Sequence, residues 1–319
     1  MRKLALLFTV LALSACKKKE KSPEPTPGSA VAPGDAAAAA EDTAPAAWDG
    51  KSPLTVGEAF STPESVLHDA DADVYLVSNI NGEPTGVDDN GFISRMSPDG
   101  KVTEAKWIDG AKDDVKLDAP KGMAIVNGVL YISDITVVRQ FDAKTGEPKG
   151  EIKIDGATFL NDIAPAPDGG IYVTDSGLTP EFKSNGTDAV YHVNKDGKVK
   201  PLIKDKTLGG PNGVAAATDG VWVVTFGSGE IYQVNAKGKK AAPQKLPKGQ
   251  LDGIVVLDGG DVLVSSWEAS AIFRGKPGGD WKPVVEGVQS PADIGWDSNR
   301  KRLLIPSFMG NNVVLHPLE

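Results

Sequence analysis

The 319-residue sequence has very few of the side chains that build disulfides and soft-metal sites. Its single cysteine, Cys16, excludes an intramolecular disulfide, a cysteine-based zinc site and an iron–sulfur cluster. The three histidines, His68, His192 and His316, stand far apart and lack the spacing of metal ligands. Cationic side chains are also scarce: 34 Lys and Arg face 43 Asp and Glu, for a formal net charge of −9. This balance argues against a nucleic-acid partner, because no excess of positive charge is left to neutralise phosphates.

Long apolar runs are missing as well. The apolar run at 4–13 follows the basic residues Arg2 and Lys3, and its ten residues are too few to cross a bilayer as a helix. It therefore predicts an export signal over residues 1–15. Cys16 stands directly after the small residues of the cleavage site, an arrangement that resembles the lipobox of bacterial lipoproteins.

The lipobox resemblance implies that Cys16 is acylated and anchors the mature chain in the bacterial cell envelope. Lys17 follows the cysteine in place of Asp, which favours the outer membrane, on its periplasmic or surface face. The alternative is an ordinary signal peptide cleaved after Ala15, which leaves a free thiol. Residues 16–51 combine lysines, prolines and five alanines at 36–40, a composition that cannot bury enough apolar surface to fold. We interpret them as a disordered tether ahead of a domain at 52–319.

An internal repeat begins near residue 52. Each of its six copies has a short apolar strand, a turn and a second apolar strand that ends in Ser or Thr. These second strands are expected at 74–78, 130–133, 171–174, 221–225, 262–265 and 303–307. Alternating strands that run into Asp-Gly or Lys-Gly turns lie between the copies, which gives four strands per repeat. No stretch has sustained helical periodicity.

The count of repeats predicts the architecture. About 265 residues over six copies give roughly 44 per copy, the length of a four-stranded propeller blade. Composition alone also allows a β-sandwich, but six copies in register favour an all-β, six-bladed β-propeller of antiparallel blades. The last copy has strands near 292–296, 302–307 and 312–317 and then stops, so we expect residues 54–60 to supply its outer strand. N- and C-terminal strands then close the ring and remove its open edge. We expect a monomer.

The innermost strand of each blade lines the central channel of a propeller, so the residues that start these strands converge on one mouth. The corresponding positions here are Glu64, Lys121, Asn161, Asn212, Asp252 and either Ala292 or Asp293. Residue type varies at this position while the flanking positions stay apolar. That divergence indicates a ligand site; the alternative is a polar, water-filled channel.

Three of these side chains suggest a metal site. Glu64, Asn212 and Asp252 offer hard oxygen ligands of the kind preferred by Ca²⁺, Mg²⁺ or Mn²⁺. One divalent cation that keeps coordination positions free for water and substrate can polarise a carbonyl and lower the pKa of a bound water molecule. Asp252 can alternatively act as the general base for that water, which makes it the candidate catalytic residue.

Four short motifs carry a resemblance to a known family. They are Pro63-Glu64, Leu160-Asn161-Asp162, Pro211-Asn212-Gly213-Val214 and Leu251-Asp252-Gly253. In this order they resemble the senescence marker protein, gluconolactonase and luciferin-regenerating enzyme (LRE-like) family of six-bladed propellers, over residues 52–319. The resemblance implies one divalent cation on Glu64, Asn212 and Asp252, and contacts from Asn161 and Asp162 to substrate or to water beside the metal. It also implies hydrolysis of sugar lactones and other cyclic esters.

Two features depart from the family pattern. Ser65-Val66-Leu67 stands after Glu64, where the family commonly has Gly-Pro and Trp. Lys121 places an ammonium at the mouth, where it can bind a substrate carboxylate or stabilise an oxyanion. Alternatively, Lys121 is the counter-ion of Glu64 and Asp252 and makes the metal unnecessary.

Two functions follow from these observations. The first is an envelope-anchored, metal-dependent hydrolase whose partner is a small lactone-like substrate bound by Asn161, Asp162 and Lys121. The second is a non-catalytic envelope propeller that binds a protein, a peptide or a glycan. Trp267 follows a channel-lining strand pair and can stack on a ligand. A serine-hydrolase triad is not expected, because no histidine is placed beside the strand-end serines by the repeat.

Overall fold

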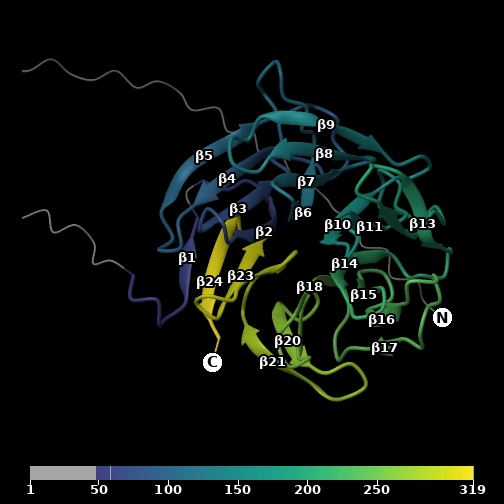
Figure 1. The fold of residues 1–319 in the computed structure, drawn as a ribbon. Helices are drawn as coiled ribbons and strands as arrows, with labels where there is room; N and C mark the ends of the chain where they lie inside the picture. The colour runs from purple at the N-terminus through teal and green to yellow at the C-terminus, as the bar shows by residue number, and fades with distance from the viewer. Residues whose placement is uncertain (1–47, 58, 319) are drawn as a thin grey trace, which may run out of the picture. The chain divides into compact units, whose positions relative to one another are not determined.

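The computed structural model describes residues 48–57 and 59–318. The secondary structure of these residues consists of twenty-four strands in six four-stranded antiparallel sheets, arranged as a ring (Figure 1). The six-bladed propeller expected from the repeat is therefore confirmed. Within the described residues, no helix long and apolar enough to cross a bilayer is present. Residues 1–47, which hold the expected signal, Cys16 and most of the tether, lie outside this part of the chain.

Blades one to five each use four consecutive strands, with the innermost strand first. Blades one and two are β2 (Pro63–Asp69), β3 (Val74–Asn79), β4 (Phe92–Met96), β5 (Val102–Asp109), and β6 (Pro120–Val126), β7 (Val129–Asp134), β8 (Val137–Asp142), β9 (Pro148–Lys153). Blades three and four are β10 (Leu160–Pro165), β11 (Ile171–Asp175), β12 (Ala189–Val193), β13 (Val199–Lys204), and β14 (Pro211–Ala216), β15 (Val221–Thr225), β16 (Glu230–Val234), β17 (Gln244–Lys245). Blade five is β18 (Leu251–Val256), β19 (Val262–Ser266), β20 (Ala271–Gly275), β21 (Trp281–Glu286).

The sixth blade joins both ends of the domain. It consists of β22 (Gly295–Asp297), β23 (Arg302–Ser307), β24 (Asn312–Pro317) and, on the outside, β1 (Leu54–Val56). β1 pairs antiparallel with β24, and Leu54 faces Leu315 across the pair (Figure 1). The expected closure by an N-terminal outer strand is confirmed, although that strand is shorter than the predicted 54–60.

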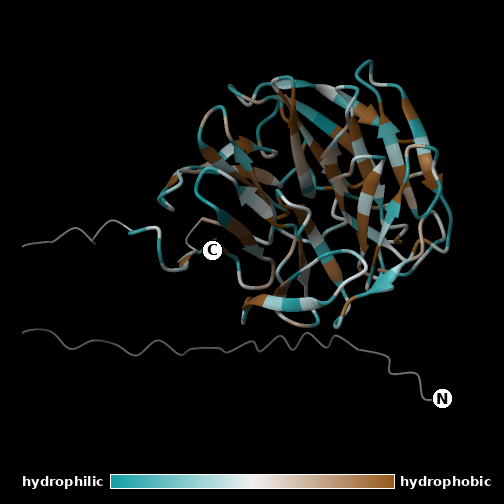
Figure 2. Ribbon diagram, turned by 60° about the horizontal axis from the view of Figure 1, so that its bottom comes forward, coloured by the Kyte–Doolittle hydropathy of each residue, from teal (hydrophilic) through white to brown (hydrophobic). Residues whose placement is uncertain are grey.

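The hydrophobic core lies between neighbouring blades. Leu76 and Ile93 of blade one, for example, pack in one buried cluster with Leu130 and Ile132 of blade two. Figure 2 shows hydrophobic segments in the strands and hydrophilic ones mostly in the loops. Each sheet is covered on both faces by its neighbours, which explains why the strands read as apolar runs in the sequence.

Each of the first five inner strands carries a β-bulge close to its start. In blade three, Leu160 faces Asp175 and Ile163 faces Val173, so Asn161 and Asp162 together oppose the single residue Thr174. The other shifts lie between Pro63 and Ser65, Pro120 and Met123, Pro211 and Val214, and Leu251 and Ile254. A bulge leaves one residue out of the ladder and redirects its side chain. The bulged residues are the positions that the repeat selected as the candidate site.

Glycines beside the bulges allow successive inner strands to come very close. A Cβ added to Gly213 would lie 2.3 Å from the carbonyl oxygen of Asp252, and one added to Gly253 would lie 2.3 Å from the nitrogen of Ile294. Any larger residue would therefore force the neighbouring inner strand away.

Hydroxyl groups fasten one blade to the next at the same level. Thr174 Oγ1 accepts a hydrogen bond from the nitrogen of Asp162 (2.9 Å) and donates one to the carbonyl oxygen of Asn212 in blade four (2.6 Å). Ser265 Oγ accepts from the nitrogen of Gly253 (2.7 Å) and donates to the carbonyl oxygen of Ala292 (2.8 Å). These contacts give a structural reason for hydroxyl residues near the ends of the second strands.

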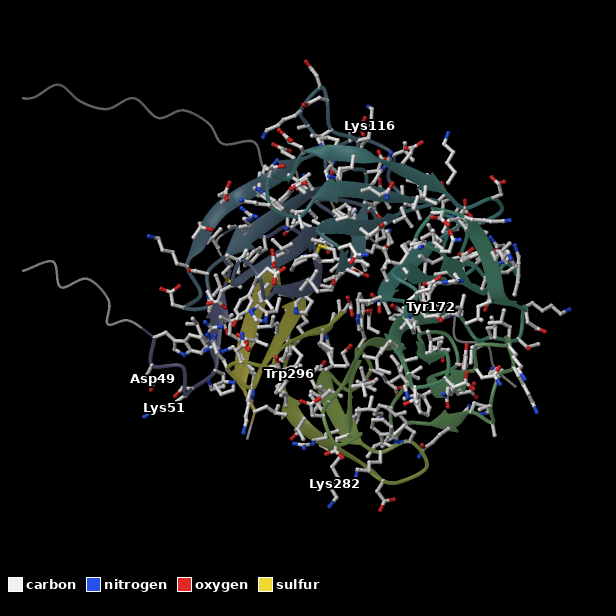
Figure 3. The ribbon with its side chains drawn as sticks, viewed as in Figure 1. Asp49, Lys51, Lys116, Tyr172, Lys282 and Trp296 are labelled. Carbon is white, nitrogen blue, oxygen red and sulfur yellow. The ribbon has the colours of Figure 1, made fainter. Side chains whose placement is uncertain are left out.

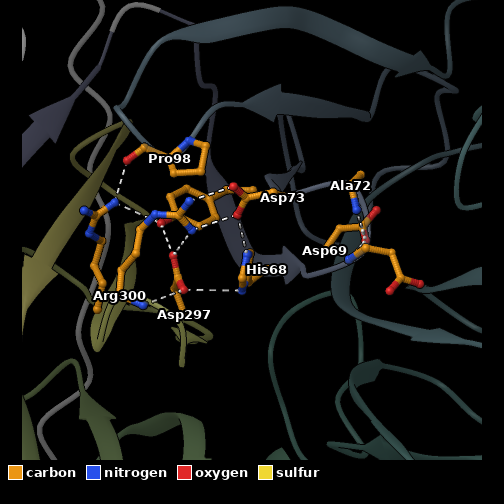
Figure 4. A network of polar contacts seen from close by, with 10 residues as sticks. His68, Asp69, Ala72, Asp73, Pro98, Asp297 and Arg300 are labelled. Atoms are coloured by element: carbon orange, nitrogen blue, oxygen red, sulfur yellow. Dashed lines mark hydrogen bonds and ion pairs between the residues drawn. The ribbon is translucent and has the colours of Figure 1, made fainter.

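An ionic network joins the last blade to the first, at the end of the channel where the inner strands finish (Figure 4). The fully buried Asp297 accepts hydrogen bonds from Tyr75 Oη (2.6 Å) and Arg300 Nη1 (3.0 Å). Arg300 also pairs bidentately with Asp73 at 2.7 and 2.6 Å, and these hydrogen bonds lower the pKa of Asp73 to about 2. His68 Nε2 lies 3.3 Å from Asp73 Oδ1. This network ties the ring closed away from the candidate site.

Candidate functional site

The candidate residues gather at the mouth, which we define as the end of the central channel where the inner strands begin. Glu64, Asn161, Asn212 and Asp252 are 3–4% exposed, and Lys121 is 1% exposed. In Figure 3 the labelled charged side chains Asp49, Lys51, Lys116 and Lys282 lie at the outer edge of the ring. The charged side chains at the mouth are therefore buried, whereas those labelled at the outer edge lie at the surface of the ring.

Four buried carboxyl groups influence one another at the mouth. Burial raises the pKa of Glu64 well above its usual range, and the charges of Asp252 and Asp293 raise it further. Burial and the charge of Asp293 likewise raise the pKa values of Asp162 and Asp252. A group of carboxyls with raised pKa values holds protons unless a positive charge compensates the carboxylates.

Four buried side-chain oxygens of the mouth have no hydrogen-bond partner. They come from the bulged residues of four blades: Glu64 Oε2, Asn161 Oδ1, Asn212 Oδ1 and Asp252 Oδ1. Leaving a buried acceptor unsatisfied costs about 1–3 kcal/mol. Carboxylate and amide oxygens are the ligands that Ca²⁺, Mg²⁺ and Mn²⁺ prefer, so this set fits a hard divalent cation. Across residues 48–57 and 59–318, no three His, Cys, Asp or Glu side chains are grouped closely enough to hold an ion by themselves, so the set depends on its amide oxygens.

Asp162 has a different environment from the other candidates. Its Oδ1 accepts a hydrogen bond from the nitrogen of Ile163 (2.6 Å), and its Oδ2 accepts one from the nitrogen of Val214 in blade four (2.7 Å). The carboxyl group thus fixes the bulge of β10 and binds β14. No local sequence pattern predicts this role of Asp162, because Val214 lies 52 residues further along the chain.

Lys121 lies on the opposite side of the mouth from blades four and five. Its Nζ donates a hydrogen bond to the carbonyl oxygen of Ala119 (2.9 Å) and lies 4.7 Å from the centre of the Phe159 ring. Burial lowers its pKa to about 8, although Glu64 and Asp134 act in the opposite direction. Within the described residues it forms no ion pair with Glu64 or Asp252, so the arrangement expected of a bridging counter-ion is not observed.

In the sixth blade the polar candidate is Asp293. Its side chain is 7% exposed, and its Oδ2 accepts a hydrogen bond from Ser65 Oγ (2.5 Å). Its nitrogen donates to the carbonyl oxygen of Glu64 (2.9 Å), so blades six and one meet directly at the site. Burial raises the pKa of Asp293 to about 7, against the lowering effect of Ser65. The sequence repeat left the choice between Ala292 and Asp293 open, because both lie near the start of the strand.

Comparison with known proteins identifies a family and a shared fold. Residues 89–295 match the family described as the SMP-30/Gluconolactonase/LRE-like region. Among solved structures, a gluconolactonase from Xanthomonas campestris is 19% identical, with a TM-score of 0.65 over 84% of this chain and 89% of its own. A luciferin-regenerating enzyme is 15% identical (TM-score 0.61, 82% and 94% covered). Virginiamycin B lyase from Staphylococcus aureus is also 15% identical (TM-score 0.60, 84% and 99% covered). Identities this low establish the shared fold alone. No curated protein matches the chain.

The raised carboxyl pKa values predict an unusual pH dependence of stability in the presence of a chelator. The pKa of Asp293 is about 7 in the folded protein against an ordinary value of 3.8, so the folded state binds the extra proton between these values. The free energy of unfolding should therefore fall as the pH rises from about 4 to about 7. Urea unfolding with EDTA across this range measures the slope.

Asp293→Asn should flatten that slope, because an amide does not titrate. The matched control is Asp113→Asn, which removes an exposed carboxyl and should leave the slope unchanged. Equal slopes in the wild type and in Asp293→Asn would contradict the assignment.

Proposed function

The chain belongs to the SMP-30/gluconolactonase/LRE-like family, and from this premise we propose that it is a divalent-cation-dependent hydrolase of a lactone or another small cyclic ester. The observation that carries the proposal is the set of four unpartnered buried oxygens at the mouth, each from a different blade. Such a set is costly unless a cation satisfies it. The raised pKa values of Glu64 and Asp252 favour the same occupant, because a bound cation would compensate the carboxylates that otherwise hold protons.

Glu64, Asn212 and Asp252 would hold the cation, with the amide oxygen of Asn161 beside them. When bound, a divalent cation supplies Lewis-acid polarisation of an ester carbonyl. Hydrolysis consumes one water, breaks the acyl–oxygen bond of the ring and yields a hydroxy acid. Asp252 takes the proton of the attacking water and returns it to the ring oxygen as that bond breaks. Asp162 holds the bulge of β10 in place through its backbone hydrogen bonds.

Lys121 would stabilise the negative charge that develops on the carbonyl oxygen. Its pKa of about 8 keeps it mainly protonated at neutral pH. A preorganised, buried hydrogen-bond donor stabilises an oxyanion far better than a solvated one does. Its contact with the Phe159 ring fixes the position of the ammonium.

The positions of the histidines favour hydrolysis over the chemistry of one structural neighbour. A histidine-to-alanine variant of virginiamycin B lyase is described as catalytically inactive. Here His68 lies near Asp73, His192 pairs with Asp168, and His316 faces Leu303, all at the end of the blades opposite the mouth. A lyase step that needs a histidine at the mouth is therefore not supported by this chain.

Cation binding should be visible as a change in thermal stability. We expect Ca²⁺, Mg²⁺ or Mn²⁺, added after chelation to about 100 times its Kd, to stabilise the protein by about 2.7 kcal/mol. Asp252→Ala should abolish the shift, because it removes one of the unpartnered oxygens. Asp168→Ala, which removes an exposed carboxylate at the opposite end, should retain it. Absence of any cation effect would sink the hydrolase proposal and favour a non-catalytic binding propeller.

Replacing Lys121 tests its role in stabilising the oxyanion and, separately, the effect of its charge on cation binding. If it stabilises an oxyanion, Lys121→Met should reduce kcat/KM for a lactone such as glucono-δ-lactone by about 10²-fold, the typical effect of losing one such donor. The same variant should bind the cation more tightly, because a nearby positive charge is gone. Titration calorimetry and lactone hydrolysis measure the two effects, with the exposed Lys116→Met as control. Unchanged hydrolysis would exclude the oxyanion role.

We further propose that the protein is lipid-anchored in the cell envelope through Cys16, which lies outside the described residues. The support is the sequence alone, namely the apolar run at 4–13 followed by small residues and the single cysteine. Cys16→Ser should move the protein from the membrane fraction to the soluble fraction. Membrane association that survives this change would show that another element anchors the chain.

A further inference from the structure

Three aromatic residues form a continuous surface beside the candidate site, and the proposed function does not use them. Phe226, Trp267 and Phe308 each follow directly after the second strand of blades four, five and six. We propose that these residues, which we call the aromatic wall, determine substrate specificity by seating a hydrocarbon ring that is fused to or carried by the cyclic ester. This inference rests on the proposed function and names its substrate class.

Backbone hydrogen bonds hold the wall in register with the site. The nitrogen of Trp267 donates to the carbonyl oxygen of Gln250 (3.0 Å), two residues before Asp252. In the same way the nitrogen of Phe226 donates to the carbonyl oxygen of Gly210 (3.0 Å), two residues before Asn212. The nitrogen of Phe308 donates to the carbonyl oxygen of Ser290 (3.1 Å), which precedes the inner strand β22 of blade six. Each aromatic residue is thus fixed over the start of the inner strand of its own blade.

The three rings contact one another. Phe226 meets Trp267 edge to face at 5.4 Å between ring centres, and Trp267 meets Phe308 at 5.0 Å with the planes tilted by 48°. All three side chains are partly exposed. The indole nitrogen of Trp267 is buried and has no hydrogen-bond partner among the described residues, as is true of Asp252 Oδ1, and the backbone of Trp267 is held two residues ahead of Asp252. The wall therefore borders the oxygen set.

The corresponding positions of blades one to three are not aromatic. They hold Ile80, Ile135 and Ser176. Ile80 and Ser176 are buried, Ile135 is partly exposed, and Ser176 Oγ donates a hydrogen bond to the carbonyl oxygen of Pro211 (2.6 Å). Lys121 and its Phe159 contact lie on blades two and three. Phe159 and the exposed Phe182 of blade three also meet edge to face at 6.1 Å, so this side carries aromatic carbon as well. The three rings in mutual contact lie on blades four to six, whereas the buried ammonium of Lys121 lies on blade two.

This asymmetry selects a substrate with two unlike parts. An ester carbonyl suits the side that holds Lys121 and the unpartnered oxygens. A ring bearing hydroxyl groups all round would bury polar groups against the carbon surface of the wall, which is unfavourable without hydrogen-bond partners. A flat hydrocarbon ring gains from stacking there. The expected class is an ester of a benzo-fused or similarly apolar ring, rather than a polyhydroxylated lactone.

Binding of an unreactive probe tests the wall without requiring turnover. The probe is dihydroquinolinone, the lactam with the shape of dihydrocoumarin, titrated calorimetrically into the cation-saturated protein. Trp267→Ala and Phe308→Ala should each weaken binding by up to about tenfold, the scale of one aromatic contact. Trp296→Ala, a change to a partly buried tryptophan on inner strand β22, is the matched control and should leave binding unchanged. Two wall positions are used so that misfolding of one variant does not decide the outcome.

Kinetics distinguish failure of this inference from failure of the proposed function. Wall variants should lower kcat/KM for dihydrocoumarin by up to about tenfold and leave that for δ-valerolactone, which lacks the fused ring, unchanged. No lactam binding to the wild type, equal binding to the wall variants, or equal loss on both lactones would overturn the wall. Wall-dependent lactam binding without hydrolysis of either lactone would support the wall and reject the hydrolase.

Discussion

The close approach of neighbouring inner strands at their bulges is the constraint on which the rest of this propeller depends. Gly213 and Gly253 permit it, because a Cβ at either position would collide with the next inner strand. Thr174 and Ser265 then use their hydroxyl groups to join a bulge nitrogen to a carbonyl oxygen of the following blade. The contact is repeated around the axis, so neighbouring inner strands lie close together where they begin.

The same contact creates the candidate site. A bulge removes one residue from the ladder of each blade and leaves its side chain free to face the axis. Since neighbouring strands are so close, side chains from blades far apart in the sequence meet in a small buried volume. Glu64 and Asp252 are unpaired there, and their raised pKa values are an energetic cost that the hydrogen bonds between blades offset. Such a cost is typical of a site built for a ligand.

The two ends of the propeller hold different sets of side chains. The mouth holds the unpartnered oxygens, Lys121 and the aromatic wall. The opposite end holds His68 and the network of Asp73, Asp297 and Arg300 that links the last blade to the first. A cavity of about 420 Å³ also lies at that end, lined by apolar residues of inner strands such as Met123 and Val214. The last and first blades are therefore joined at both ends: by this network at one end, and by the contacts of Asp293 with Glu64 and Ser65 at the mouth.

The sequence by itself determined the number of blades, the strands in each and the closing role of the N-terminal strand, because these follow from periodicity along the chain. It also identified the bulged residues, since one position per repeat varied between constant apolar neighbours. Only the tertiary structure decided that Asp162 binds the backbone of the next blade, that Asp293 rather than Ala292 faces Glu64, and that Lys121 pairs with neither acidic ligand candidate. Only the tertiary structure shows that the rings of Phe226 and Phe308 contact the ring of Trp267. Each of these facts depends on segments about forty or more residues apart meeting around one axis, and local patterning carries no record of such distances.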